Sequence, residues 1–167
     1  MRVTLIRHAE AGDDAPRDEA RSLTARGRED ARRLGQALAR RGVEFSLMVT
    51  SPLVRAVQTA EIVAAEIGYR DRMMVTDLLV PEGTTSHVVT FLRSTGRQLE
   101  ETPSIALVAH EPILSALAAA LIGKARHPAL RKAEALRIRL GSGSASGPDG
   151  KGVLRWRVDA RGRREQL

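Results

Sequence analysis

Histidine and arginine side chains follow three aliphatic stretches of the sequence that have the composition of buried strands. Arg7 and His8 come directly after the first stretch. Arg55 lies five residues after the second stretch, and His110 directly follows the third. Since ligands of open α/β sheets bind beyond the carboxyl ends of the strands, we expect these side chains to meet at one edge of a sheet if the strands are neighbours.

A phosphoryl group is the ligand that suits such a cluster. Cationic and donor side chains at neighbouring strand ends repel one another unless an anion lies among them, and a phosphoryl group brings negative charge and three oxygens to share. A neutral imidazole, with an unperturbed pKa of about 6.5, is also a competent nucleophile near neutral pH. Neighbouring cations favour the unprotonated ring. These residue types therefore favour phosphoryl transfer to a histidine.

Three segments of the chain match one known family. They are Arg7-His8-Ala9, the nine residues Ser51-Pro52-Leu53-Val54-Arg55-Ala56-Val57-Gln58-Thr59, and Ala109-His110-Glu111-Pro112. Together they resemble the histidine phosphatase superfamily (phosphoglycerate mutase-like), whose hallmark is Arg-His-Gly after the first strand. The short chain, and Arg21-Ser22-Leu23-Thr24 followed by Gly27, are most similar to its protein-phosphohistidine phosphatase branch. The resemblance covers residues 1 to 122.

This resemblance implies a specific mechanism and site. It implies that His8 becomes phosphorylated, that Arg7, Arg55 and His110 hold the transferring phosphoryl group, and that water then releases inorganic phosphate. No metal and no cofactor is implied. The substrate would be a phosphorylated protein or a small phosphorylated molecule.

Two departures from the family pattern leave the substrate class open. Ala9 replaces the glycine of the hallmark, a change we expect to be tolerated where the backbone does not need a positive φ. Many relatives also carry a carboxylic acid that protonates an alkoxide leaving group, and here Asp77 and Glu82 flank the expected position. Branches that act on phosphohistidine can lack this acid because an imidazole leaves more easily. A working acid would favour a small-molecule phosphomonoesterase.

Alternating strand and helix patterns predict the elements that position these residues. Strands are predicted at Val3–Ile6, Phe45–Thr50 and Ile105–Ala109. Helices are predicted from the Thr24 cap to Gly42, from Ala56 to Gly68, over Ser86–Arg93, and from Pro112 as first helical residue to Ile122. We therefore expect an α/β fold with a mixed, mostly parallel sheet flanked by helices.

The C-terminal part of the chain has a period of two instead. Leu136–Leu140 and Leu154–Val158 alternate apolar residues with arginines, and residues 141–152 between them are rich in glycine and serine. This pattern predicts an antiparallel hairpin with a flexible loop at 141–152. We interpret residues 1–167 as a single domain.

Composition excludes several classes of protein. The 167 residues include no cysteine, which removes disulfides and thiolate chemistry and fits a cytoplasmic location. No apolar signal segment begins the chain, and His110 and Glu111 interrupt the most apolar region, so we expect no membrane span. The sequence also lacks a dinucleotide-binding loop, a Walker sequence and histidines at metal-ligand spacing.

The net charge of +7 is local to the C-terminal quarter of the chain, where 12 Lys/Arg oppose 4 Asp/Glu in residues 124–167. Alternation predicts that four arginines share the polar face of the hairpin: Arg137, Arg139, Arg155 and Arg157. Such a stripe is an alternative function, a non-catalytic module that binds anions or nucleic acid. We favour a solvent face that discourages edge pairing, because few aromatic residues are available to stack on bases.

Three polar residues near the candidate site stay outside the catalytic set. Glu10 and Glu111 serve equally well as groups that orient the arginines or cap a helix, and Ser51 serves equally well as a cap for the helix after Pro52. A mutase activity is formally compatible with the same pocket, but the short chain offers little insertion to enclose an intermediate. The preferred prediction is a cofactor-free phosphatase.

Overall fold

The computed structural model of the chain describes residues 1–99, 102–141, 152–162 and 164–165. In chain order the elements are β1 (Arg2–Arg7), the 3-10 helix η1 (Asp18–Ala20), α1 (Ala25–Ala39), β2 (Leu47–Thr50), α2 (Val54–Ile67), β3 (Met74–Val75), the 3-10 helix η2 (Asp77–Leu79), α3 (Thr85–Gln98), β4 (Ser104–Ala109), α4 (Ile113–Ile122), β5 (Glu134–Arg139), β6 (Val153–Asp159) and β7 (Arg164–Glu165).

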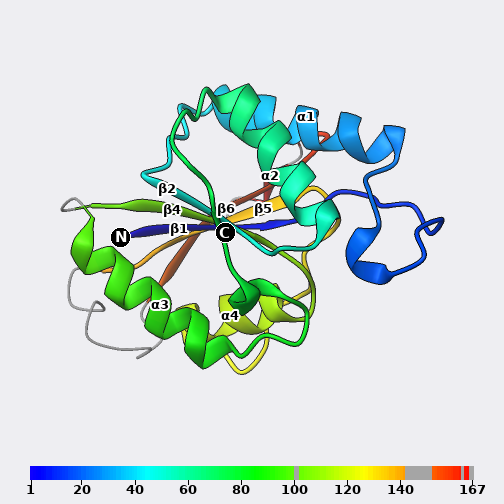
Figure 1. Ribbon diagram of the computed structural model, residues 1–167. Helices are drawn as coiled ribbons and strands as arrows, with labels where there is room; N and C mark the ends of the chain where they lie inside the picture. The colour runs from blue at the N-terminus through cyan, green and yellow to red at the C-terminus, as the bar shows by residue number, and fades with distance from the viewer. Residues whose placement is uncertain (100–101, 142–151, 163, 166–167) are drawn as a thin grey trace.

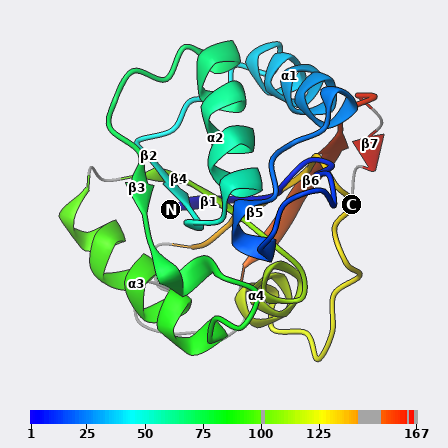
Figure 2. The same cartoon turned by 45° about the vertical axis from the view of Figure 1, so that its right-hand side comes forward.

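The described strands form one seven-stranded sheet in the order β3-β2-β4-β1-β5-β6-β7. Strands β1 to β4 pair in parallel, whereas β5, β6 and β7 each pair antiparallel to the strand before them in that order. Helices α1 and α2 cover one face of the sheet, and α3 and α4 cover the other (Figures 1 and 2). The predicted mixed α/β sheet with a C-terminal antiparallel pair is confirmed. Of the loop predicted at 141–152, residues 142–151 lie outside the described residues.

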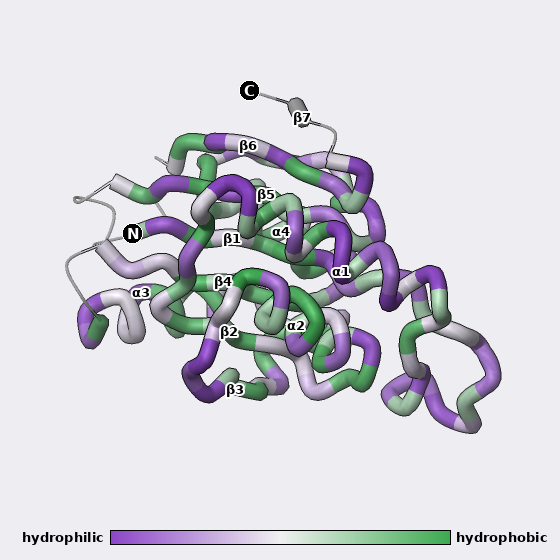
Figure 3. Tube along the Cα trace, turned by 90° about the horizontal axis from the view of Figure 1, so that it is seen from above, coloured by the Kyte–Doolittle hydropathy of each residue, from purple (hydrophilic) through white to green (hydrophobic). Residues whose placement is uncertain are grey.

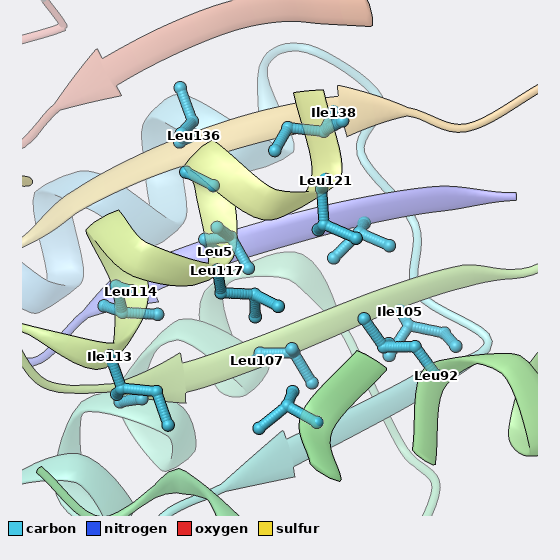
Figure 4. Close-up of a cluster of buried hydrophobic side chains, with 14 of the residues drawn as sticks. Leu5, Leu92, Ile105, Leu107, Ile113, Leu114, Leu117, Leu121, Leu136 and Ile138 are labelled. Atoms are coloured by element: carbon cyan, nitrogen blue, oxygen red, sulfur yellow. The ribbon is translucent and has the colours of Figure 1, made fainter. Parts of the chain in front are cut away.

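The central strands are buried on both faces, and their side chains alternate between two apolar layers. In β1, Val3 and Leu5 belong to the core beneath α3 and α4, while Ile6 belongs to the core beneath α1 and α2. Figure 4 shows the first of these layers, in which Leu114 and Leu117 of α4 lie against the sheet. Truncating one such leucine to alanine typically costs about 2–5 kcal/mol of folding stability. This rigid centre fixes the strand ends in space.

Local signals place the helix ends close to the predicted positions. The Thr24 hydroxyl accepts from the Gly27 N–H at the start of α1, and Gly68 ends α2 with a φ of 73°. Pro112 is the residue before α4 rather than its first residue. Helix α3 (Thr85–Gln98) extends beyond the predicted end at Arg93, although its buried residues, Val88, Val89 and Leu92, all lie within the predicted span.

The predicted arginine stripe is wrong. Arg137 is buried, donating from Nε to Thr4 Oγ1 over 3.0 Å and from Nη2 to Ser104 Oγ over 2.9 Å. Arg157 is paired with the buried carboxylate of Glu134. The strand register is the reason: Arg137 lies opposite Trp156, whereas Arg157 lies opposite Leu136, so the two arginines face opposite sides of the sheet. The four arginines therefore form no common solvent face.

A long connection between β1 and α1 extends from the carboxyl ends of the central strands. It contains η1, and most of its residues are hydrophilic where it projects from the molecule (Figure 3). Among the described residues, no helix is both long enough and apolar enough to cross a membrane. Because the connection begins directly after Arg7, its first residues lie at the predicted site.

Candidate active site

The strand register brings the two predicted histidines together. Arg7 at the end of β1 pairs with Ala109 at the end of β4, so His8 and His110 leave the sheet from adjacent parallel strands. Their ring centroids lie 4.9 Å apart. On the other side of β4, the Ser51 N–H donates to the Val108 carbonyl over 3.0 Å, which places the end of β2 beside them.

His8 is held as a neutral ring with a defined tautomer. Its Nδ1 lies 2.7 Å from the Ala9 carbonyl oxygen. Because a carbonyl can only accept, Nδ1 carries the proton and the lone pair resides on Nε2. Burial is the largest cause that lowers the pKa of His8 to about 4, and the positive charges of Arg55, Arg7 and Lys132 act in the same direction. Nε2 is therefore available as a nucleophile at neutral pH.

His110 is also neutral, and Ser51 holds it. Its Nε2 lies 2.9 Å from the Ser51 hydroxyl. Burial, followed by the neighbouring His8 and Arg55, lowers the pKa of His110 to about 3. Its Nδ1 is buried and has no hydrogen-bond partner within the described residues. Buried polar atoms are normally satisfied, so this one is suited to a ligand oxygen.

Arg55 lies in the first turn of α2 and is only 6% exposed. Thr59, one turn further along, accepts a hydrogen bond from the Ala9 N–H over 3.0 Å and donates one to the Arg55 carbonyl over 2.7 Å. This hydroxyl ties the backbone beside His8 to the helix that carries Arg55. The negative φ and full burial of Ala9 confirm that glycine is not needed there.

Asp18 is a site residue that sequence reasoning missed. Arg55 Nη1 donates to the Asp18 carbonyl over 2.7 Å, and its Nη2 donates to the Asp18 carboxylate over 2.8 Å. Arg21 bonds the other carboxylate oxygen over 3.0 Å. Hydrogen bonds from Arg55 and Arg21 lower the pKa of Asp18. The length of the β1–α1 connection was the available signal, since loops of this length are usually functional.

Arg7 extends from the last position of β1 toward the connection between α4 and β5. Its Nη1 donates to the Leu130 carbonyl over 2.6 Å. Its Nε is buried without a partner among the described residues, like Nδ1 of His110. Nearby, Ala133 donates its N–H to the His8 carbonyl over 3.2 Å and has a φ of 50°, which is strained for alanine.

The two predicted acids make no hydrogen bond to this cluster in the described structure. Asp77 begins η2 and Glu82 follows it, and both side chains are exposed. Within the described structure, neither carboxylate is hydrogen-bonded to the two histidines or the two arginines. Across the same residues, no group of three or more potential metal-binding side chains is assembled.

Comparisons with known proteins find similar phosphatases. A model of the histidine phosphatase superfamily (branch 1) matches residues 3–80. Phosphohistidine phosphatase SixA of Escherichia coli is 31% identical over 121 residues, which cover 72% of this chain and 74% of SixA. The mitochondrial serine/threonine-protein phosphatase Pgam5 of Drosophila persimilis is 37% identical over 81 residues, but the match spans only 28% of its length. A structure of the protein histidine phosphatase SixA complexed with tungstate superimposes with a TM-score of 0.86 at 25% identity, covering 96% of this chain and 98% of that one.

Proposed function

This chain belongs to the histidine phosphatase superfamily, and we propose that it removes the phosphoryl group from a phosphohistidine carried by a protein, through a phosphorylated His8. In the first step, the Nε2 lone pair of His8 attacks phosphorus while the bond to the leaving imidazole breaks. That imidazole keeps the electron pair of the broken bond and takes a proton from a solvent water molecule. In the second step, water attacks phosphorus, the bond to Nε2 breaks, and inorganic phosphate leaves.

The surrounding groups suit each charge that develops. Arg7, Arg55 and His110 offer donors to the phosphoryl oxygens, and preorganised donors of this kind lower the barrier most where water is excluded. The hydrogen bond from Nδ1–H of His8 to the Ala9 carbonyl oxygen, with 2.7 Å between nitrogen and oxygen, stabilises the positive charge that the His8 ring gains on phosphorylation. These are proposed roles for residues that the fold brings together.

The nature of the carboxylate beside the site carries the proposal for phosphohistidine. Asp18 accepts hydrogen bonds from Arg55 and Arg21, which lower a pKa that already lies well below neutral, so it is ionised at neutral pH. An ionised carboxylate has no proton to give to an alkoxide. A leaving imidazole needs less help because it is a far better leaving group. The site therefore suits phosphohistidine better than a phosphate ester.

A charged cleft also bears on the substrate. The cleft, of about 340 Å³, is lined by eight residues of which seven are charged; they include Lys132, whose positive charge adds to the effect of burial in lowering the pKa of His8, but none of the four proposed catalytic residues. Such a lining suits the polar surface of a phosphorylated protein. The sequence similarity to SixA, a phosphohistidine phosphatase, points in the same direction.

A panel of substrates tests this proposal. We expect kcat/KM for a phosphohistidine protein to exceed that for phosphoserine, phosphotyrosine or sugar phosphates by about 100-fold or more, because only the esters need a general acid. The double variant Asp77→Asn with Glu82→Gln serves as the control and should leave phosphohistidine turnover unchanged. Preferred turnover of a sugar phosphate that this double variant abolishes would establish the small-molecule phosphomonoesterase instead.

The lowered pKa of His8 predicts the pH dependence of the first step. Because His8 has a pKa of about 4, its Nε2 stays unprotonated down to that pH. The rate of phosphoenzyme formation, measured in single turnovers and corrected for spontaneous hydrolysis, should therefore be flat between pH 8 and pH 5. An ordinary histidine would lose about tenfold per pH unit below about 6.5. A decline that begins at pH 6.5 would contradict the buried, neutral His8.

A further inference from the structure

Glu111 takes part in a hydrogen-bonded chain that ends on Arg7. The carboxylate oxygen Oε1 of Glu111 accepts from the Leu130 N–H over 2.7 Å. The carbonyl of the same residue, Leu130, accepts from Arg7 Nη1 over 2.6 Å. One residue of the connection between α4 and β5 therefore joins a carboxylate to the guanidinium that we propose binds the phosphoryl group.

Glu111 and Leu130, the first and middle members of this chain, are anchored in the fold. The other carboxylate oxygen of Glu111 accepts from the Ser115 N–H over 3.2 Å and from its hydroxyl over 2.6 Å, which fixes the carboxylate to the first turn of α4. The Leu130 side chain is 1% exposed and belongs to the apolar core beneath α3 and α4. The backbone of Leu130 is thus held by its side chain and by Glu111 together.

Such a chain affects how Arg7 presents its donors. A guanidinium is planar, so fixing Nη1 on one acceptor fixes the directions of its remaining N–H groups. A residue whose N–H donates to a carboxylate is also held in one orientation, and hydrogen bonds in series polarise one another in a low-dielectric setting. The Arg7 Nε, buried without a partner among the described residues, is one of the donors set in this way.

We propose that Glu111 is a positioning residue for Arg7, acting through Leu130 to aim the guanidinium at the phosphoryl group. The inference rests on the proposed function only in that Arg7 binds the phosphoryl group. Glu111 lies directly after His110 in the sequence, so one short segment supplies a side chain to the cluster and controls a second from outside it. The role of Glu111 is more specific than capping α4, because only Oε2 bonds that helix.

Binding of inorganic phosphate tests the role without depending on turnover. We expect Glu111→Ala to raise the dissociation constant for phosphate, measured by NMR titration, by about tenfold, the usual scale for losing a charge-assisted hydrogen bond. Glu111→Gln keeps an oxygen acceptor for the Leu130 N–H and should stay within about threefold of the parent chain. Ser115→Ala removes only the Oε2 arm and is the matched control, also expected within about threefold.

A double-mutant cycle separates positioning from a general structural effect. In an Arg7→Ala background, Glu111→Ala should change the phosphate dissociation constant by less than about twofold, since its target is gone. Equal weakening in both backgrounds, or an equal effect of Ser115→Ala, would overturn the inference. Thermal unfolding identifies a variant that fails to fold; if Glu111→Ala does, Glu111→Met, which also removes the acceptor for the Leu130 N–H but fills a similar space, takes its place in the cycle. If the cycle holds but no phosphohistidine is hydrolysed, the proposed function fails and the positioning role stands.

Discussion

We expect replacing His8 with alanine to lower kcat by about 10⁴-fold or more, the scale on which enzymes lose activity with their nucleophile. The reason is that, in the proposed mechanism, Nε2 of His8 supplies the lone pair that attacks phosphorus. The hydrogen bond from the Nδ1–H of His8 to the Ala9 carbonyl leaves the lone pair of His8 on Nε2, whereas Nε2 of His110 is hydrogen-bonded to Ser51. The measurement is single-turnover release of labelled phosphate from a phosphohistidine protein.

A trapping experiment completes this test. Quenching the parent chain during turnover should leave labelled phosphate on the peptide that contains His8, and the His8→Ala variant should carry none. His87→Ala is the matched control, because His87 is an exposed histidine of α3 that makes no hydrogen bond to the cluster in the described structure. An active His8→Ala protein, or label on another residue, would rule out the proposed mechanism.

The positions of the site residues could be predicted from the sequence because they depend on local patterns. The apolar runs that form β1 and β4 are buried on both faces, and such runs are readable as central parallel strands. Each apolar run is followed directly by polar residues, so His8 and His110 could be placed at strand ends. Parallel pairing of these strands then brings the two rings together.

The partners of these residues could not be predicted in this way. Asp18 reaches Arg55 across 37 positions and Leu130 reaches Arg7 across 123, and neither contact has a periodic signal. The arginine stripe failed for a related reason. Alternation gives the side of a strand that a residue faces, but the register shift between Arg137 and Ile138 and the pairing with β6 decide what lies there.

Arg55 is the residue whose loss should be most damaging after that of His8. We expect Arg55→Ala to lower kcat by roughly 10²–10³-fold, the usual cost of removing one preorganised donor to a developing negative charge. Arg55→Lys should recover only part of this loss, since a single ammonium cannot reproduce the planar fork. Steady-state kinetics on a phosphohistidine protein measures both variants. Thermal unfolding controls for the lost contact with η1.

The bond between Arg55 and Asp18 makes this prediction sharper. Removing the guanidinium leaves the Asp18 carboxylate without that partner. The carboxylate would then lie beside the place where we propose that the negatively charged phosphoryl group binds. The double variant Arg55→Ala with Asp18→Asn should therefore be about tenfold more active than Arg55→Ala alone, because it removes this repulsion. A double variant that is no better than the single one would mean that Asp18 does not face the phosphoryl group. The ion pair would then only anchor η1 to α2.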